Sequence, residues 1–337
     1  MSILVTGGAG YLGSHVCLRL LEEGYDVVAF DNFCNSSRTA LARVSEMAGE
    51  TFRLYQGDVR NGNQLIEIIT QNDVDAIIHL AALKSVPESF TRPLEYYENN
   101  VGGTLTLLRV MAMTGVPHLV FSSSAAVYGD NCCPAREDDP LAPTSPYGRS
   151  KMTCERMIAD YAAVNEDFSA VVLRYFNPIG AHPSGQIGEA PKGAPGNLFP
   201  RLLKAAAKGE KLTVTGGDFA TPDGTGQRDY LHVLDLADGH LAALEALERR
   251  PAGVLTCNLG GGRGVSVLEL LTAFEQATGV RIPYEIAARR EGDLAASWAE
   301  IDRAAKELGW KPTRDLEEAC RDGWAFQQEN PDGYPAE

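Results

Sequence analysis

The chain has 337 residues, of which 44% are hydrophobic and 22% charged, and these values indicate a globular protein of about two domains. The formal net charge of −15 excludes nonspecific binding to nucleic acid or to an anionic membrane, since both would be repelled. No apolar run approaches the roughly 18 residues that span a bilayer, and the opening ILVTGG follows no basic signal region, so we expect a cytoplasmic protein.

Six short runs rich in β-branched residues alternate with amphipathic stretches over the first half of the chain. The runs read ILVTGG, DVVAFDN, FRLYQGD, VDAIIHLAA, HLVFSSS and SAVVLRYFN. Stretches between them, such as SHVCLRLLEEG and TLTLLRVMAMTG, end at a glycine suited to terminate a helix. Parallel strands need crossovers, and helical crossovers cover both faces of a sheet. The order therefore predicts an α/β fold with a doubly wound parallel sheet of the Rossmann type, with its ligand beyond the carboxyl ends of the strands.

The first strand runs directly into VTGGAGYLG, which places Gly7, Gly10 and Gly13 at the start of a helix. Glycines there let backbone N–H groups and the helix dipole approach a pyrophosphate. A glycine-rich run alone also occurs in ordinary turns, but the order of strand, glycines and helix favours a dinucleotide site. Asp31 ends the second strand, where a carboxylate accepts from ribose hydroxyls and repels a 2′-phosphate, so NAD is favoured over NADP. The alternative for Asp31 is a turn former.

The fifth strand ends in Ser122, Ser123 and Ser124, and the later segment SPYGRSK has Tyr147 four residues before Lys151. Ser145 and Pro146 can open a helix there, which places the phenol and the ammonium on one face. A neighbouring ammonium, a positive nicotinamide ring and a helix N-terminus all favour the phenolate. We therefore expect Tyr147 to act as a general base toward a hydroxyl, with Ser124 sharing the hydrogen bond.

After residue 177 the pattern changes to loops rich in Gly and Pro, which predicts a smaller substrate domain over residues 177–337 beside a cofactor domain over residues 1–176. One helix is well marked there, because Ser266 and Glu269 have the spacing of a capping box and Gly279 supplies a stop. The seven cysteines have neither zinc-site spacing nor the even number of a disulfide framework, so we expect no metal site and mostly buried thiols. The adjacent Cys132 and Cys133 are expected as exposed thiols in a loop. The cysteines are Cys17, Cys34, Cys132, Cys133, Cys154, Cys257 and Cys320.

The serine, tyrosine and lysine resemble the active residues of the extended short-chain dehydrogenase/reductase superfamily. Within it, the chain is similar from end to end to the UDP-glucose 4-epimerase (UDP-galactose 4-epimerase) family. The matching blocks are LVTGGAGYLGSH, DNFCNSSR, GDVRN, PLEYYENNVGGTL, FSSSAAVYGD, SPYGRSK, LRYFNPIGAHPSG, DGTGQRDYLHV and RREGD.

This resemblance implies a reversible C4 epimerisation of UDP-hexoses in galactose metabolism, through a transient 4-keto sugar with tightly held NAD as hydride carrier. It implies that Ser124, Tyr147 and Lys151 are catalytic. The implied cofactor-binding residues are Gly7, Gly10, Tyr11, Leu12, Gly13, Asp31, Asn32, Asp58, Val59, Leu80, Lys84, Asn99, Ser122, Tyr147, Lys151 and Tyr175.

The residues implied for the UDP-sugar are Ser124, Asn177, Asn197, Leu198, Arg228, Arg290, Asp293 and Ser297. Two arginines suit a diphosphate, although Arg228 could instead pair with Asp229, and RREGD could be a solvated charge run. Ser297 matches a position that is a bulky Tyr in family members restricted to unacetylated hexoses. Its small side chain predicts activity on UDP-N-acetylhexosamines as well, unless a neighbouring group refills the space.

Several alternatives remain. A uronate or pentose 4-epimerase would share this chemistry, and a noncatalytic NAD-sensing regulator would keep the glycines. A 4,6-dehydratase is disfavoured, because Ala125 and Ala126 follow Ser124 where an acid is needed. The helices around residues 94–111 and 151–164 resemble the family's dimer-forming four-helix arrangement, so a homodimer is expected, but their apolar faces could also pack on the sheet.

Overall fold

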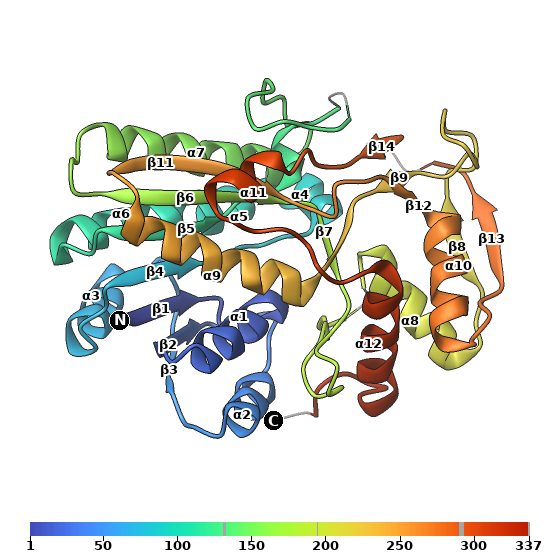
Figure 1. The fold of residues 1–337 in the computed structure, drawn as a ribbon, viewed down its shortest axis with the longest axis horizontal. Helices are drawn as coiled ribbons and strands as arrows, with labels where there is room; N and C mark the ends of the chain where they lie inside the picture. Colours follow the sequence, from blue (N-terminus) through green and yellow to red (C-terminus); the bar gives the residue numbers. More distant parts are fainter. Residues whose placement is uncertain (131–132, 194, 290–292, 336–337) are drawn as a thin grey trace.

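A seven-stranded parallel sheet forms the centre of the larger part of the molecule (Figure 1). The computed structural model describes residues 1–130, 133–193, 195–289 and 293–335. The strand order is β11-β6-β5-β4-β1-β2-β3. Six of these strands coincide with the six predicted runs, which confirms the doubly wound fold. The strands are β1 Ser2–Thr6, β2 Asp26–Asp31, β3 Arg53–Gln56, β4 Ala76–His79, β5 His118–Ser122, β6 Ser169–Tyr175 and β11 Gly253–Leu259.

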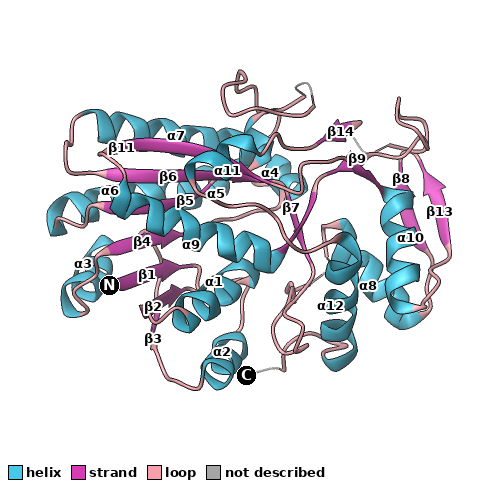
Figure 2. Cartoon of the chain, in the orientation of Figure 1, coloured by secondary structure: helices cyan, strands magenta, loops and turns pink. Residues whose placement is uncertain are grey.

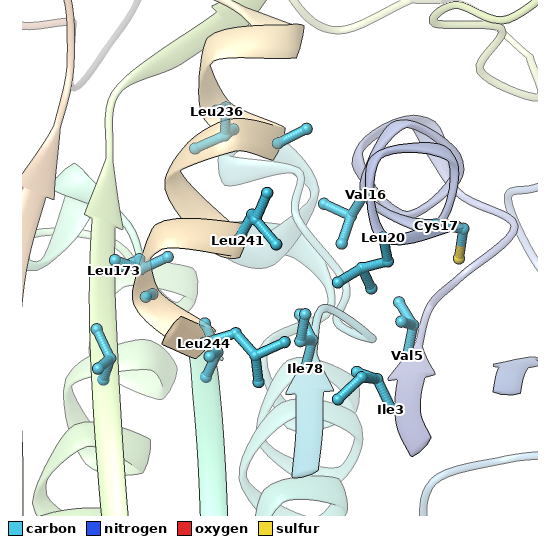
Figure 3. Packing of buried hydrophobic residues seen from close by; sticks show 14 of the residues in the cluster. Ile3, Val5, Val16, Cys17, Leu20, Ile78, Leu173, Leu236, Leu241 and Leu244 are labelled. Carbon is cyan, nitrogen blue, oxygen red and sulfur yellow. The ribbon is translucent and has the colours of Figure 1, made fainter. Parts of the chain in front are cut away.

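Helices cover both faces of this sheet, as Figure 2 shows. The strand residues alternate between the faces: Ile3 and Val5 pack on one side and Leu4 on the other, all fully buried. Each such side chain stabilises the fold by about 1.5–3 kcal/mol. One layer contains α1 Tyr11–Glu22, α2 Arg38–Ala48 and α9 Val233–Arg249, and its packing on the sheet is seen in Figure 3. The other layer contains α3 Gly62–Gln71, α6 Gly102–Thr114 and α7 Pro146–Ala163.

Short helices precede α6 at the carboxyl side of the sheet. They are α4 Val86–Thr91, α5 Pro93–Tyr96 and a π-helical turn, η1 Tyr97–Val101. A 3₁₀ turn, η2 Ala125–Val127, directly follows Ser124. Among the described residues, no helix is both long enough and apolar enough to cross a membrane.

The smaller part of the molecule is built from short strands and three longer helices around a separate core. Its sheets pair β10 with β7, β13 with β8, and β9 with both β12 and β14. The strands are β7 Asn177–Ile179, β8 Leu212–Thr215, β9 Gln227–Arg228, β10 Tyr230–His232, β12 Val265–Ser266, β13 Tyr284–Ala287 and β14 Ala296–Ser297. The longer helices are α8 Leu198–Lys208, α10 Val267–Thr278 and α12 Leu316–Glu329, whereas the short helix α11 Asp302–Glu307 packs on the large sheet, where its Ala304 belongs to the core.

The division into domains at residues 1–176 and 177–337 remains a prediction. In the structure, two later elements pack with the first domain. Strand β11 returns to the large sheet and pairs with β6 along its full length, and α9 packs against the same sheet (Figure 3). The chain after residue 177 therefore contributes to both parts of the molecule.

Local signals in the sequence define several helix ends. The capping box of Ser266 and Glu269 is present, and Gly279 ends α10 in the left-handed conformation, as predicted. Ser145 caps α7, since its hydroxyl accepts from the Gly148 N–H at 3.0 Å. Four cysteines are buried as predicted, Cys34 is exposed and Cys133 is half-buried, while Cys132 lies outside the described residues. The buried cysteines are Cys17, Cys154, Cys257 and Cys320.

Candidate active site

The glycine-rich turn joins β1 to α1 at the carboxyl edge of the sheet. Gly7 has a φ of 73°, and a Cβ on it would lie 2.8 Å from the Ala81 nitrogen. A Cβ on Gly13 would lie 2.1 Å from the Gly7 oxygen, so only glycine allows the helix to approach the strand this closely. No side chain caps α1 at Gly10. The positive end of the helix therefore has its first N–H groups available to an anion.

Asp31 lies at the end of β2 and organises this turn. Its carboxylate accepts from the Ala9 N–H at 3.0 Å and from the Phe33 N–H and the Ser36 hydroxyl, both at 2.8 Å. Asp31 thus stabilises the turn, which agrees with its alternative interpretation as a turn former. A carboxylate has about four acceptor sites, so Asp31 retains capacity for a ribose hydroxyl.

The other residues predicted for the cofactor follow successive strands along the same edge. Asp58 and Val59 follow β3, Leu80 follows β4, Ser122 ends β5 and Tyr175 ends β6. Val59 is buried under α6, because a Cβ on Gly103 would lie 2.7 Å from its side chain. Asp58 pairs with Arg60 at 2.8 Å, and Asn32 donates to Asp58 at 3.4 Å. The structure thus lines up these residues in the order of the strands.

Two further predicted residues connect this edge to the smaller part of the molecule. The Tyr11 hydroxyl donates to the Gly180 carbonyl at 2.7 Å. Lys84 pairs with Glu189 at 2.9 Å. Asn99 lies in η1 and donates to the Asn100 side chain at 3.0 Å. Tyr11 and Lys84 thus each contact a residue beyond position 177.

The first two turns of α7 bring Tyr147 and Lys151 to the end of β5. Both side chains are buried, and the Lys151 ammonium donates to the Ser122 carbonyl at 2.6 Å. Gly148 makes the close approach possible, since a Cβ on it would lie 2.5 Å from the Ala126 oxygen. The start of α7 therefore packs directly against the η2 turn that carries Ser124.

Two effects of opposite sign act on the pKa of Tyr147. Burial raises its pKa above the usual value of 10.0, and the hydrogen bond with Ser124 only partly offsets this. The Lys151 ammonium donates to the Ser122 carbonyl, and its expected effect on the phenol, like that of a nicotinamide ring, stays a prediction. Ser124 is a protein group that favours the phenolate.

Lys151 itself is strongly affected by its surroundings. Burial lowers its pKa from 10.5 to about 8, although Cys154 and Glu155 counteract part of this. Its ammonium also lies 5.0 Å from the centre of the Phe121 ring. Beside it, the Ser122 hydroxyl is hydrogen-bonded to the Tyr175 hydroxyl. Ser122, Lys151 and Tyr175 thus form one connected group at the carboxyl ends of β5 and β6.

The predicted substrate residues meet around β9. Arg228 donates to the carbonyl groups of Gln227 and Leu294 at 2.8 and 2.9 Å. Ser297 on β14 stands beside Arg228 in the strand pairing. The backbone of Asp229, the next residue, bonds to Asn177 on one side and Ser297 on the other, each at 3.0 Å. Three residues that are far apart in the sequence are thereby assembled.

The Asp229 carboxylate is engaged by backbone N–H groups, which disagrees with the alternative interpretation of Arg228 as its salt-bridge partner. It is fully buried and accepts from the backbone N–H groups of Gly261, Gly262 and Ala299. Burial raises its pKa to about 6 despite these bonds. Asp229 thus fixes the strand that carries Ser297 to the strand that carries Arg228.

Three further residues predicted for the substrate lie outside the group around β9. Asn197 precedes α8 without capping it, and Leu198 is the first residue of that helix. Asp293 accepts from the Thr215 hydroxyl at 3.4 Å, which brings the end of β8 beside the predicted uridine site. Arg290 lies outside the described residues.

Sequence reasoning missed three residues that shape the site. Gly148 was visible inside SPYGRSK, but its close approach to Ala126 depends on tertiary packing. Glu189 pairs with Lys84 across 105 positions, and no spacing rule predicts such a contact. Asp229 was considered only as a neighbour of Arg228; it lies between the short strands β9 and β10, and its burial depends on distant segments.

The segment after η2 connects the two groups of residues. The Ala135 N–H donates to the Trp298 carbonyl at 2.8 Å, and the Glu300 N–H donates to the Ala135 carbonyl at 2.9 Å. Val127, Tyr128, Phe176 and Ala299 pack together with Ala135 beneath it. The chain that leaves Ser124 therefore bonds to the chain that leaves Ser297.

These features define the class of protein. A glycine-lined helix start, an acid at the end of the second strand and a tyrosine–lysine helix beside a serine are the arrangement expected for the cofactor and proton-transfer groups of a short-chain dehydrogenase/reductase type of enzyme. The model of the NAD dependent epimerase/dehydratase family matches residues 3–260, and the chain belongs to that family.

Individual relatives are similar over nearly the whole chain. A UDP-glucose 4-epimerase of Yersinia pestis is 50% identical over 99% of this chain and 100% of its own length. The crystal structure of UDP-glucose 4-epimerase from Bifidobacterium longum in complex with NAD+ and UDP is 45% identical, with a TM-score of 0.95 over 99% of this chain and 100% of that one. The UDP-glucose-4-epimerase from Stenotrophomonas maltophila with bound NAD and formylated UDP-arabinopyranose is 46% identical, with a TM-score of 0.94 over 98% of both chains.

Proposed function

We propose that this chain is a UDP-glucose 4-epimerase that interconverts UDP-glucose and UDP-galactose with tightly held NAD. The observation that carries the proposal is the placement of the buried Tyr147 and Lys151 beside the half-buried Ser124 at the carboxyl edge of the sheet. The similarity to relatives of that name over the full chain supports it.

The residues present fit NAD. The uncapped start of α1 at Gly10 suits a pyrophosphate, and Asp31 and Asn32 suit the adenosine ribose. Asp58 and Val59 would border the adenine, and the groove would continue along the ends of β4 to β6. The residues proposed to line it are Tyr11, Leu12, Leu80, Lys84, Asn99, Ser122, Lys151 and Tyr175.

The chemistry requires one group that moves a proton at the sugar 4-hydroxyl. When bound, NAD takes the hydride from C4 and returns it to the opposite face of the transient 4-keto sugar. Tyr147 receives the hydroxyl proton and later gives it back. Ser124 shares its hydrogen bond with Tyr147 and lowers the pKa of the phenol, whose burial excludes competing water. Lys151 holds a positive charge beside the site and would bind the nicotinamide ribose.

The UDP group would lie over the small sheets. Arg228 and Arg290 would neutralise the diphosphate, which an acidic protein has to do locally. Asp293 would accept from the uridine ribose hydroxyls, and Asn177, Asn197 and Leu198 would line the remainder.

We also propose that the enzyme accepts UDP-N-acetylhexosamines. Ser297 is half-buried beside Arg228, so its side chain lies within the substrate region and is small. The main alternative activity, on a UDP-uronate or UDP-pentose, would use the same proton-transfer group and would differ only in contacts to C6 of the sugar. A noncatalytic NAD-sensing role is disfavoured because both Tyr147 and Lys151 are present.

The proposal is tested on purified protein without added NAD. kcat/KM is measured for UDP-galactose and for UDP-N-acetylgalactosamine, after retained cofactor has been confirmed by mass spectrometry of the denatured protein. Turnover of both substrates supports the proposal in full. Turnover of UDP-galactose alone contradicts the wider sugar range, and turnover of neither contradicts the epimerase assignment and directs attention to uronates, pentoses or regulation.

A homodimer in the cytoplasm is also proposed. The sheet-facing side of α6 and α7 belongs to the core, as the alternative interpretation held, but large apolar side chains remain exposed nearby on α4, α5 and α6. They are Val86, Phe90, Leu94, Leu105 and Met113. A second copy of the chain would cover them, and light scattering of Leu94→Glu against the parent protein tests this.

A further inference from the structure

A buried ion pair lies behind the candidate catalytic residues and takes no part in the proposed chemistry. Glu155 follows Lys151 by four residues and Tyr147 by eight, so all three face the sheet from α7. Its partner is Arg174 on β6, at 2.6 Å. Glu155 and Arg174 are 8% and 5% exposed. A pair this deeply buried is weak evidence for stability, because its desolvation opposes its attraction.

Glu155 also holds the turn that carries Ser124. The Ser123 hydroxyl donates to the Glu155 carboxylate, and Ser124 is the next residue. The Ser123 N–H donates to the Leu173 carbonyl of β6 at 2.8 Å. The backbone before Ser124 is thus fixed to β6 by its amide and to α7 by its side chain.

Arg174 extends the same connections to the segment after η2. Its guanidinium donates to the Tyr128 hydroxyl at 3.1 Å and to the Glu137 carbonyl at 3.0 Å. Tyr128 in turn donates to Asn258 on β11 at 2.6 Å. The ion pair therefore joins α7, the turn before Ser124, and the segment that bonds to the chain after Ser297.

Resting on the proposed function, we infer that Glu155 and Arg174 are positioning residues, which hold Ser124 in register with Tyr147 through the Ser123 hydroxyl. Three contacts join α7 to this segment: Gly148 lies against Ala126, Lys151 donates to the Ser122 carbonyl, and Glu155 accepts from the Ser123 hydroxyl. Without the contact to Glu155, the segment between Ser122 and Ala126 loses its side-chain anchor on α7. Although it keeps the Ser123 N–H bond to Leu173, Ser124 can then shift relative to Tyr147. A displacement of this kind by about 1 Å costs on the order of 100-fold in rate.

The test compares two double variants that both remove the charged pair. Glu155→Met/Arg174→Met leaves no acceptor for Ser123, whereas Glu155→Gln/Arg174→Met keeps an oxygen at that position. Replacing both members of a buried pair with uncharged residues avoids an unpaired buried charge, so both variants are expected to fold. A third variant, Ser123→Ala, removes the hydroxyl and leaves the ion pair intact.

The expected results separate positioning from stability. Glu155→Met/Arg174→Met and Ser123→Ala should lose about 10- to 100-fold in kcat with unchanged KM for UDP-galactose and unchanged retention of NAD, and the Gln variant should recover most of the loss. The matched control is Arg250→Met/Glu307→Met. It removes an ion pair of 2.6 Å. Arg250 precedes β11 and so lies at the amino edge of the sheet, away from the candidate site, and this variant should keep the parental kcat.

Two results would overturn the inference: parental kcat in both Glu155→Met/Arg174→Met and Ser123→Ala, or equal losses in the Met and Gln double variants. The parent protein is assayed first. If it does not epimerise UDP-galactose, the proposed function fails; if it does and the variants behave like it, only the positioning role fails. If the parent protein does not epimerise UDP-galactose, the reduction of its bound NAD by UDP-galactose still reports on the alignment of Ser124 and Tyr147.

Discussion

The two parts of the candidate site are built in different ways. The catalytic part stands on the large parallel sheet, and its residues come from the ends of consecutive strands and from the first two turns of one helix. The substrate part is assembled from strands of two to four residues, brought together by the backbone and the buried carboxylate of Asp229. The comparison teaches that the catalytic candidates are placed mainly by regular secondary structure, with polar contacts such as that of Glu155 with Ser123 added to it, whereas the substrate candidates are placed mainly by individual polar contacts.

The largest expected effect tests the catalytic part. Tyr147→Phe removes the proton acceptor and should lower kcat by about 10²- to 10⁴-fold, with KM for UDP-galactose little changed. Steady-state kinetics check this. Tyr161→Phe, a phenol at the far end of the same helix, is the control and should retain activity. A Tyr147→Phe protein with parental kcat would place the proton transfer elsewhere.

A second change at the same edge should trade activity for stability. Because burial lowers the pKa of Lys151 from 10.5 to about 8, the folded state binds fewer protons than the unfolded state between these values. The cost of burying the ammonium is present in full below about pH 8 and disappears as the pH rises toward 10.5. Lys151→Met should therefore be inactive, yet more stable at pH 7 by up to about 3 kcal/mol.

Denaturant titrations of Lys151→Met and the parent protein at pH 7 and pH 10 measure this difference. The gain should be larger at pH 7 than at pH 10. An equal gain at both values, or a loss at pH 7, would show that the bond from Lys151 to the Ser122 carbonyl outweighs its desolvation. In the parent protein, the loss of the Lys151 proton should make kcat decline above about pH 8.

The substrate part should respond through specificity rather than rate. Ser297→Tyr fills the space beside Arg228 and should lower kcat/KM for UDP-N-acetylgalactosamine by about 10- to 200-fold, or 1–3 kcal/mol, while UDP-galactose is retained. Paired assays on the two substrates check this. Ser297→Ala serves as the control and should keep both activities. Equal losses on both substrates would indicate a general disturbance of β14.

The smallest expected effect comes from removing one helix cap in each of the two parts. Ser145 caps α7 in the catalytic part and Ser266 caps α10 in the substrate part. Replacing either with Ala should cost about 1 kcal/mol of unfolding free energy. Only Ser145→Ala should also lower kcat, because the start of α7 carries Tyr147. Thermal unfolding and steady-state kinetics of both variants test whether only the cap of α7 affects kcat.

The sequence was most informative where a local pattern determines the structure. The six strands, the glycine turn, the α7 start at Ser145 and the capping box of Ser266 all depend on neighbouring residues, and each was predicted at its observed place. The roles of Ser124, Tyr147 and Lys151 remain predictions, although their proximity follows from the same patterns.

What the sequence did not provide depends on contacts between distant segments. The raised pKa of Tyr147 arises from burial, which the four-residue spacing to Lys151 does not reveal. The contacts of Glu155 with Arg174 and of Asp229 with Ala299 join elements that only the folded chain brings together. Short strands such as β9 and β14 have too few residues to show a period.

The return of the chain to its first sheet also bears on how the protein is made. Strand β11 covers the side of β6, yet residues 253–259 leave the ribosome more than 75 positions after β6. At about 5–20 residues per second, the apolar edge of β6 stays open for several seconds in every nascent chain. During that interval it is an unpaired sheet edge of the kind that can template strand pairing with other chains, and the arrival of β11 closes it.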